Sequence, residues 1–177
     1  MANAMYGLGR EAFLEGAIDA LTDTLAVSLV TSAYAANLST DQFYNIISGG
    51  AIVAGPVTLT SVVGSLGTLG AANAIFSSVS GTACSQVVLF KNTGTSSTSP
   101  LIGNINVATG LPVTPNGGNI TVAWAGGVIF TLFEGLAEDE KDWRVWNRVK
   151  EIARELRGRW KRSEGGIYLP EPSILLG

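Results

Sequence analysis

Histidine is absent from this chain of 177 residues, and cysteine occurs only once. Without imidazole, the chain lacks the side chain that most often moves protons near neutral pH, and it has no site where histidine could ligate a metal. A single cysteine also excludes a disulfide within the chain. These absences remove most hydrolase and metalloenzyme mechanisms. The sequence therefore predicts a protein that is not an enzyme and that uses no cofactor or metal.

Charged residues are scarce as well, at 14% of the chain against roughly 25% in a typical soluble domain. Residues 24–133 contain only Asp41 and Lys91, whereas residues 138–162 contain six acids and nine bases. A freely diffusing monomer normally has a dispersed charged surface, so the weakly charged stretch indicates an exterior that neighbouring molecules cover. The alternative is a neutral surface made of Ser, Thr, Asn and Gly.

A long apolar helix is also missing from the sequence pattern. Residues 42–90 are uncharged, but several glycines interrupt them and Ser and Thr are scattered throughout. A membrane span needs about 20 predominantly apolar residues, so we expect no membrane partner. Residues 1–6 lack the basic and apolar regions of a secretory signal. We therefore expect the protein to remain where it is made or to leave inside an assembly.

Short β-strand patterns fill the weakly charged part of the chain. Seven segments show apolar runs or an alternation with period two, both typical of strands. They are residues 24–31, 57–62, 74–79, 86–90, 101–107, 120–124 and 128–133. The polar residues 92–100 predict a long-looped hairpin between the fourth and fifth segments. Because no helices alternate with these strands, the sequence predicts a mainly β fold, an antiparallel β-sandwich or barrel-like domain over residues 24–133.

Helix signals precede and interrupt this predicted domain. Residues 1–23 are expected to form an N-terminal arm or a short helix. Residues 39–42 have the pattern of a capping box, in which the first and last side chains satisfy backbone groups at a helix start. We therefore expect a short inserted helix over residues 43–47 that ends at Gly49 and Gly50.

The heavily charged part of the chain predicts an appended amphipathic α-helix over residues 134–164. Acids gather at its start and bases at its end, as the helix dipole favours. Apolar residues recur at spacings of three and four, typical of a coiled coil or of a helix docked on a partner. Residues 165–177 are apolar but interrupted by proline, and we expect an extended arm. The residues expected to contact other proteins are Trp143, Trp146, Val149, Ala153, Leu156, Trp160, Ile167, Tyr168 and Leu169.

Motifs that carry chemistry are weak. Residues 7–12 match a dinucleotide-binding fingerprint, but that motif needs a preceding strand, and we expect none before residue 7. With no histidine to activate it, Cys84 is interpreted as a buried structural thiol.

The bases of residues 144–162 could contact phosphates, but two glutamates interrupt them. The pI of 4.9 also lies far below the value of about 9 that is usual for DNA-binding domains. Nucleic acid is therefore the less favoured partner.

Several segments together resemble a known family. They are Met1–Tyr6, Gly9–Gly16, Lys91–Gly94 and above all Thr109–Gly118, a connection rich in proline and glycine, with Ile120, Trp124 and Ile129–Phe130. In these segments the chain resembles a family of small virion proteins of tailed bacteriophages, which are encoded beside the major capsid protein. The resemblance covers roughly residues 1–133, and residues 134–177 are an addition to the family pattern.

The resemblance implies a non-enzymatic capsid cement or decoration protein that stabilises the shell through multi-copy protein–protein contacts. Its partners would be the major capsid protein or other virion proteins, and we expect a homo-oligomer. It would reside in the virion after assembly in the host cytoplasm. The few charges and the two candidate arms suit such a role, because buried area replaces chemistry as the function. The alternatives are a neck or tail component, a nucleic-acid-binding module that uses the basic segment and, ranked last, a carbohydrate-binding sandwich.

Overall fold

A computed structural model describes residues 3–132 of the chain. The chain divides into two units, residues 1–132 and residues 133–177. The predicted helix over residues 134–164 and the predicted arm over residues 165–177 lie outside the described residues. The fold presented below is that of the first unit.

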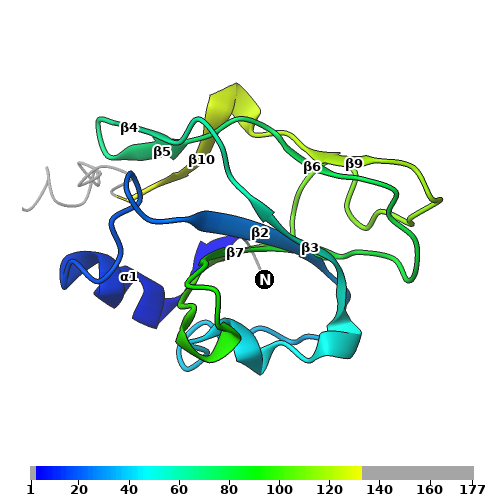
Figure 1. The fold of residues 1–177 in the computed structure, drawn as a ribbon, viewed down its shortest axis with the longest axis horizontal. Helices are drawn as coiled ribbons and strands as arrows, with labels where there is room; N and C mark the ends of the chain where they lie inside the picture. Colours follow the sequence, from blue (N-terminus) through cyan, green and yellow to red (C-terminus); the bar gives the residue numbers. More distant parts are fainter. Residues whose placement is uncertain (1–2, 133–177) are drawn as a thin grey trace, which may run out of the picture. The chain divides into compact units, whose positions relative to one another are not determined.

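The first unit is mainly β, and every strand pair in it is antiparallel, as the sequence predicts (Figure 1). Its strands are β1 (Ala4–Met5), β2 (Leu25–Val30), β3 (Ile52–Thr58), β4 (Val63–Ser65), β5 (Thr68–Gly70), β6 (Ala74–Phe76), β7 (Gln86–Lys91), β8 (Leu101–Ile105), β9 (Ile120–Val122) and β10 (Val128–Thr131). Its helical elements are α1 (Gly7–Leu14) and the 3-10 turns η1 (Tyr44–Ile46), η2 (Gly49–Ala51), η3 (Ser96–Thr98) and η4 (Ala125–Gly127).

A central five-stranded sheet, in the order β1-β8-β7-β2-β3, organises the domain. Two smaller sheets, β10-β5-β4 and β6-β9, lie over one face of the central sheet and form the second layer of a β-sandwich (Figure 1). The opposite face is covered by loops and 3-10 turns from residues 31–51. The central sheet is therefore buried on both sides.

Strand β2 shows how the sequence produces this double burial. Leu25, Val27 and Leu29 enter the core between the two sheet layers, while Ala26 and Val30 enter the core on the other face. All six residues of β2 are buried. A strand covered on both faces favours apolar residues at most positions, which explains why this segment is a nearly continuous apolar run instead of alternating. The one polar residue, Ser28, is buried and bonds to the hydroxyl of Tyr44. The prediction of a buried strand at residues 24–31 is confirmed, with slightly narrower bounds.

The long-looped hairpin is also confirmed, because β7 and β8 pair directly. The predicted strand over residues 57–62 is only partly right. Strand β3 ends at Thr58, and Ser61 adopts a left-handed conformation with φ 51° that redirects the chain toward the smaller sheet. Strands β4 and β5 follow as a hairpin that the pattern did not indicate. The last two predicted strands do not pair with each other, since β9 joins β6 and β10 joins β5.

The short helix expected over residues 43–47 is present only as the three-residue 3-10 turn η1. The capping box does not form, and no side chain caps the turn. The backbone N–H of Ser39, which the side chain of Gln42 was expected to bind, instead donates to the side-chain oxygen of Asn37 at 3.1 Å. This local alternative competes with helix initiation, as short polar side chains often do.

The N-terminal segment begins with β1 and continues into α1. The expectation that no strand precedes residue 7 is therefore wrong. Strand β1 runs antiparallel to β8, however, so α1 does not belong to a parallel βαβ unit and the dinucleotide fingerprint lacks its structural context. Gly9 instead has a packing role, because a Cβ there would overlap the carbonyl oxygen of Leu101 in β8. Its missing side chain lets α1 lie directly on the sheet edge.

Candidate protein-binding surface

The nine residues predicted to contact other proteins all lie outside the described residues. They are Trp143, Trp146, Val149, Ala153, Leu156, Trp160, Ile167, Tyr168 and Leu169. A candidate surface that the sequence pattern did not indicate lies within the described domain itself.

This surface is an apolar hollow of about 550 Å³ between the end of α1, the β4–β5 hairpin and the end of β10. Its floor consists of Phe13, Ile18, Leu69 and Phe130, and the rings of Phe13 and Phe130 meet edge to face with centroids 5.9 Å apart. These elements lie together at one end of the domain (Figure 1). Ile18 and Leu69 also belong to the core between the sheets, so the hollow opens directly from the packed interior.

Three large apolar side chains stand at the rim of the hollow. Leu66 is 99% exposed, Leu21 is 61% exposed and Leu132 is 40% exposed. Single exposed leucines are common on protein surfaces, but several of them around one apolar hollow are typical of an interaction site. We call the hollow and these three residues the leucine rim.

Leu66 is also held in an unfavourable backbone conformation. It forms the two-residue turn of the β4–β5 hairpin with Gly67, and both have positive φ, 49° and 77°. Such a turn favours Asn or Gly at its first position, while a left-handed conformation costs other residues roughly 1–2 kcal/mol. Leu66 gains no burial within the described residues to offset this cost. Backbone strain together with full exposure is the pattern expected of a residue that contacts another molecule.

Within residues 3–132, strand β4 is a short sheet edge beside the leucine rim with which no further strand pairs. It is the outer strand of its sheet, and all three of its residues are exposed. Natural edge strands usually carry a charge, a proline or a bulge that prevents pairing with another chain. Residues 63–65 have neither a charge nor a proline.

Acidic groups border the leucine rim on the side of α1. Glu15 and Asp19 are both exposed, and Asp19 lines the hollow itself. The backbone N–H of Leu21 donates to a carboxylate oxygen of Asp19, and this bond lowers the pKa of that carboxyl. Nearby Asp23 pairs with Lys91 at 2.8 Å, the one ion pair among the residues that the structure describes. Asp19 thus places a carboxylate at the hollow, and Glu15 adjoins Gly16, which also lines it.

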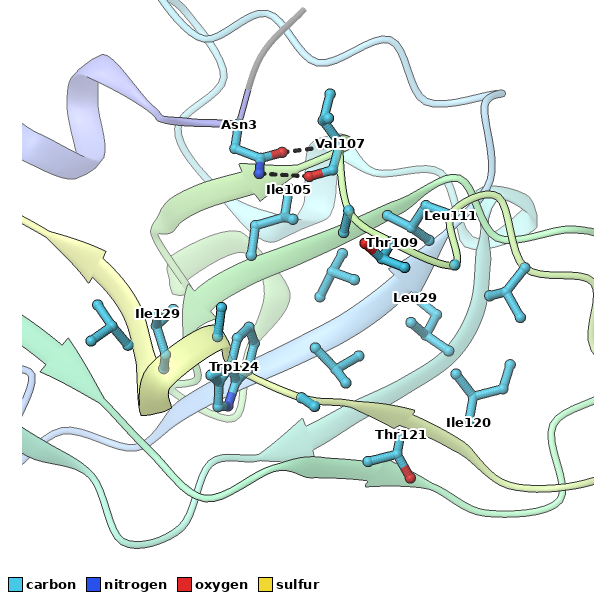
Figure 2. Close-up of a pocket in the computed structure, with 18 of the residues that line it drawn as sticks. Asn3, Leu29, Ile105, Val107, Thr109, Leu111, Ile120, Thr121, Trp124 and Ile129 are labelled. Atoms are coloured by element: carbon cyan, nitrogen blue, oxygen red, sulfur yellow. Dashed lines mark hydrogen bonds between the residues drawn. The ribbon is translucent and has the colours of Figure 1, made fainter.

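A second cavity of about 680 Å³ lies between the two sheet layers (Figure 2). Leu29 and Ile105 of the central sheet face Ile120, Trp124 and Ile129 of the opposite layer across it. No charged side chain lines this cavity within the described residues, so its lining suits an apolar group better than acid–base chemistry.

The mouth of this second cavity is held by Asn3. Its side-chain amide donates to the carbonyl of Val107 at 2.8 Å, and its side-chain oxygen accepts from the backbone N–H groups of Asn106 and Val107. The indole N–H of Trp124 donates to the carbonyl of Ala72 at 3.1 Å. These contacts hold the walls of the cavity in place, so we interpret the cavity as a gap in the packing between the two sheet layers.

Other kinds of site have little support in residues 3–132. No three or more Cys, Asp or Glu side chains gather there as metal ligands would. No helix in this part of the chain combines the length and apolar character needed to cross a membrane. Cys84 is fully buried, as the sequence predicts, and burial raises the pKa of its thiol.

Comparison with known proteins provides no relative from which a role could be transferred: no protein-family model and no curated protein matches this chain. The leucine rim is therefore interpreted from its own geometry. Sequence reasoning missed it because its residues come from segments far apart in the chain, residues 13–21, 64–69 and 130–132. The one local signal is Leu66-Gly67, where a leucine occupies a turn position that favours Asn or Gly.

Proposed function

We propose that this protein is a non-enzymatic structural component of a tailed-phage virion, and specifically a capsid cement or decoration protein that binds the shell in many copies. The observation that carries the proposal is the leucine rim, an apolar binding surface on a domain with few charges. Residues 3–132 contain seven charged side chains. The resemblance of residues 1–133 to small virion proteins supports the same role.

The energetic argument rests on buried area. Contacts between virion proteins last because apolar surface leaves water, which contributes about 25 cal/mol per Å². A weakly charged surface loses little hydration free energy when a neighbour covers it, since few ionised groups must be desolvated. The partners that fit this surface are the major capsid protein, other virion proteins and further copies of this chain. A position in the neck or tail of the virion would rely on the same apolar contacts between proteins.

Attachment to particles lacking the protein tests the proposal. We expect the full chain to saturate such particles and to stay bound in about 0.5 M salt, because apolar contacts depend weakly on ionic strength. A variant that ends at Phe133 should fold but occupy fewer sites, since residues 134–177 are an addition to the family pattern. Failure of the full chain to bind particles at any salt concentration would refute the proposal.

The same preparation tests the nucleic-acid alternative. Phosphate contacts by six to eight bases would lower affinity roughly a thousandfold or more between 50 and 200 mM salt. We expect only weak, nonspecific DNA binding by the isolated protein. Tight binding at about 150 mM salt that is lost when Arg154, Arg157 and Arg159 become Gln would favour the nucleic-acid module instead.

A further inference from the structure

We infer that the leucine rim is the docking site for residues 143–162 of a second copy of this chain. The inference rests on the proposed function and deepens it, because a shell protein present in many copies places identical chains side by side. It identifies the contact that would link neighbouring copies.

The apolar parts of the two surfaces correspond. The hollow presents aromatic and aliphatic side chains on its floor and leucines at its rim. Residues 143–162 are predicted to be helical, with large apolar residues spaced by three and four. These residues are Trp146, Val149, Ala153, Leu156 and Trp160. An amphipathic helix that lays its apolar face into a groove is a recurrent mode of recognition.

The charges correspond as well. Asp19 lines the hollow and Glu15 adjoins Gly16, which also lines it, so two acidic residues border the hollow on this side. Residues 144–162 contain eight bases and two acids, so the segment brings positive charge on either side of its apolar face. Complementary charge at the edge of an apolar contact fixes its orientation and speeds association more than it adds affinity.

The order of charges along the chain favours a second copy as the source of this segment. Residues 134–142 begin two positions after Leu132 and contain five acids and one base. The residues nearest to the rim in sequence therefore have the same sign of charge as Glu15 and Asp19. The basic segment of another copy can approach the rim without bringing the acidic residues of its own chain close to Glu15 and Asp19. Such a contact joins two different surfaces, so it can be repeated from copy to copy.

Disulfide cross-linking between two differently tagged full-length chains tests the inference, in a background where Cys84→Ala removes the native thiol. One chain carries Leu66→Cys and the other carries Val149→Cys. We expect a mixed disulfide on oxidation. As the control, Ile75→Cys in β6, which is 53% exposed, should give no mixed product. If a single chain carrying both cysteines closes only on itself, the second copy is excluded as the occupant.

Leu66→Asp supplies a second readout, because Leu66 is almost fully exposed and its loss leaves the domain folded. We expect light scattering to show at least a tenfold weaker association, with Ile75→Asp unchanged. Association unaffected by Leu66→Asp would overturn the inference. Particle occupancy, measured in parallel, separates the two claims. Copies that cross-link but never bind particles contradict the proposed function alone, while bound copies that fail to cross-link contradict the inference alone.

Discussion

At the scale of single residues, a buried network of polar side chains lies under the central sheet. The hydroxyl of Tyr34 donates to a carboxylate oxygen of Asp41 at 2.7 Å and lies 2.9 Å from the hydroxyl of Tyr6. The same carboxylate oxygen accepts from the backbone of Asn37. Tyr6, Tyr34 and Asp41 are all buried. The network therefore ties the loop over residues 31–48 to the N-terminal segment, and it explains one of the two charges in residues 24–133.

We expect Tyr34→Phe to lower the free energy of unfolding by about 1–3 kcal/mol, because the buried carboxylate of Asp41 loses a hydrogen-bond donor. Denaturant unfolding measures the change. Tyr44→Phe is the matched control, since the Tyr44 hydroxyl bonds only to the neutral hydroxyl of Ser28 at 2.8 Å. Its cost should be smaller, about 1 kcal/mol. Equal costs for the two variants would argue against a special role of Asp41.

Alkaline pH should destabilise the domain through the same tyrosines. Burial raises the pKa of Tyr6 to about 12 and raises the pKa of Tyr34 further, against about 10 in an unfolded chain. A raised pKa favours the neutral form in the fold, so this stabilisation is complete below about pH 10 and is lost as pH rises through 12. We expect the unfolding free energy to fall by up to about 1.4 kcal/mol per pH unit for each tyrosine. Tyr6→Phe should reduce the slope, and an unchanged slope would contradict this origin.

At the scale of elements, the sequence predicts the strands of the central sheet well and those of the smaller sheets poorly. Strands β2 and β7 are mostly apolar runs, because burial on both faces favours apolar residues at most positions. Strands β4 and β5 are three residues each and rich in glycine and polar residues, so neither an apolar run nor a clear alternation marks them. The helix expected over residues 43–47 shortens to the turn η1 for a different reason, because the expected capping box does not form.

Helix α1 provides a test in which a glycine-to-alanine substitution should destabilise the domain instead of stabilising it. Replacing glycine by alanine inside a helix normally stabilises it by up to about 1 kcal/mol. We expect Gly9→Ala to destabilise the domain by about 1–3 kcal/mol, because the new Cβ would overlap the Leu101 carbonyl and push α1 off β8. Gly49→Ala, where the added Cβ meets open space, is the control and should be nearly neutral. Thermal unfolding of both variants decides, and a stabilised Gly9→Ala protein would show that α1 is not packed this closely.

A substitution in the β4–β5 hairpin should change the stability of the domain and the association between copies in opposite directions. We expect Leu66→Asn to stabilise the domain by about 1 kcal/mol, since Asn tolerates the left-handed conformation that Leu66 adopts. The same change should weaken association between copies, because the apolar rim loses its most exposed side chain. A variant that is more stable yet associates less identifies a residue kept for contact. A loss of stability would instead show that Leu66 supports the fold.

At the scale of the whole molecule, the fold class could be predicted and the binding surface could not. Turn residues and apolar runs are local signals, and they suffice to indicate an antiparallel β domain. The leucine rim combines Phe13, Leu21, Leu66 and Phe130, whose proximity depends on how α1 and the segment after it pack against the β10-β5-β4 sheet. The apolar spacing over residues 143–160, by contrast, can be recognised from the sequence alone. Its role in binding remains a prediction, because that segment lies outside the described residues.

Electron microscopy of the parent particle, at a resolution that shows individual domains, tests the central claim most directly. We predict density for the β domain in many copies at regular positions on the shell, absent from particles assembled without this chain. Neighbouring copies should be joined at the end of the domain that carries Leu66. Particles with identical density in the presence and absence of the chain would contradict the assignment to the virion.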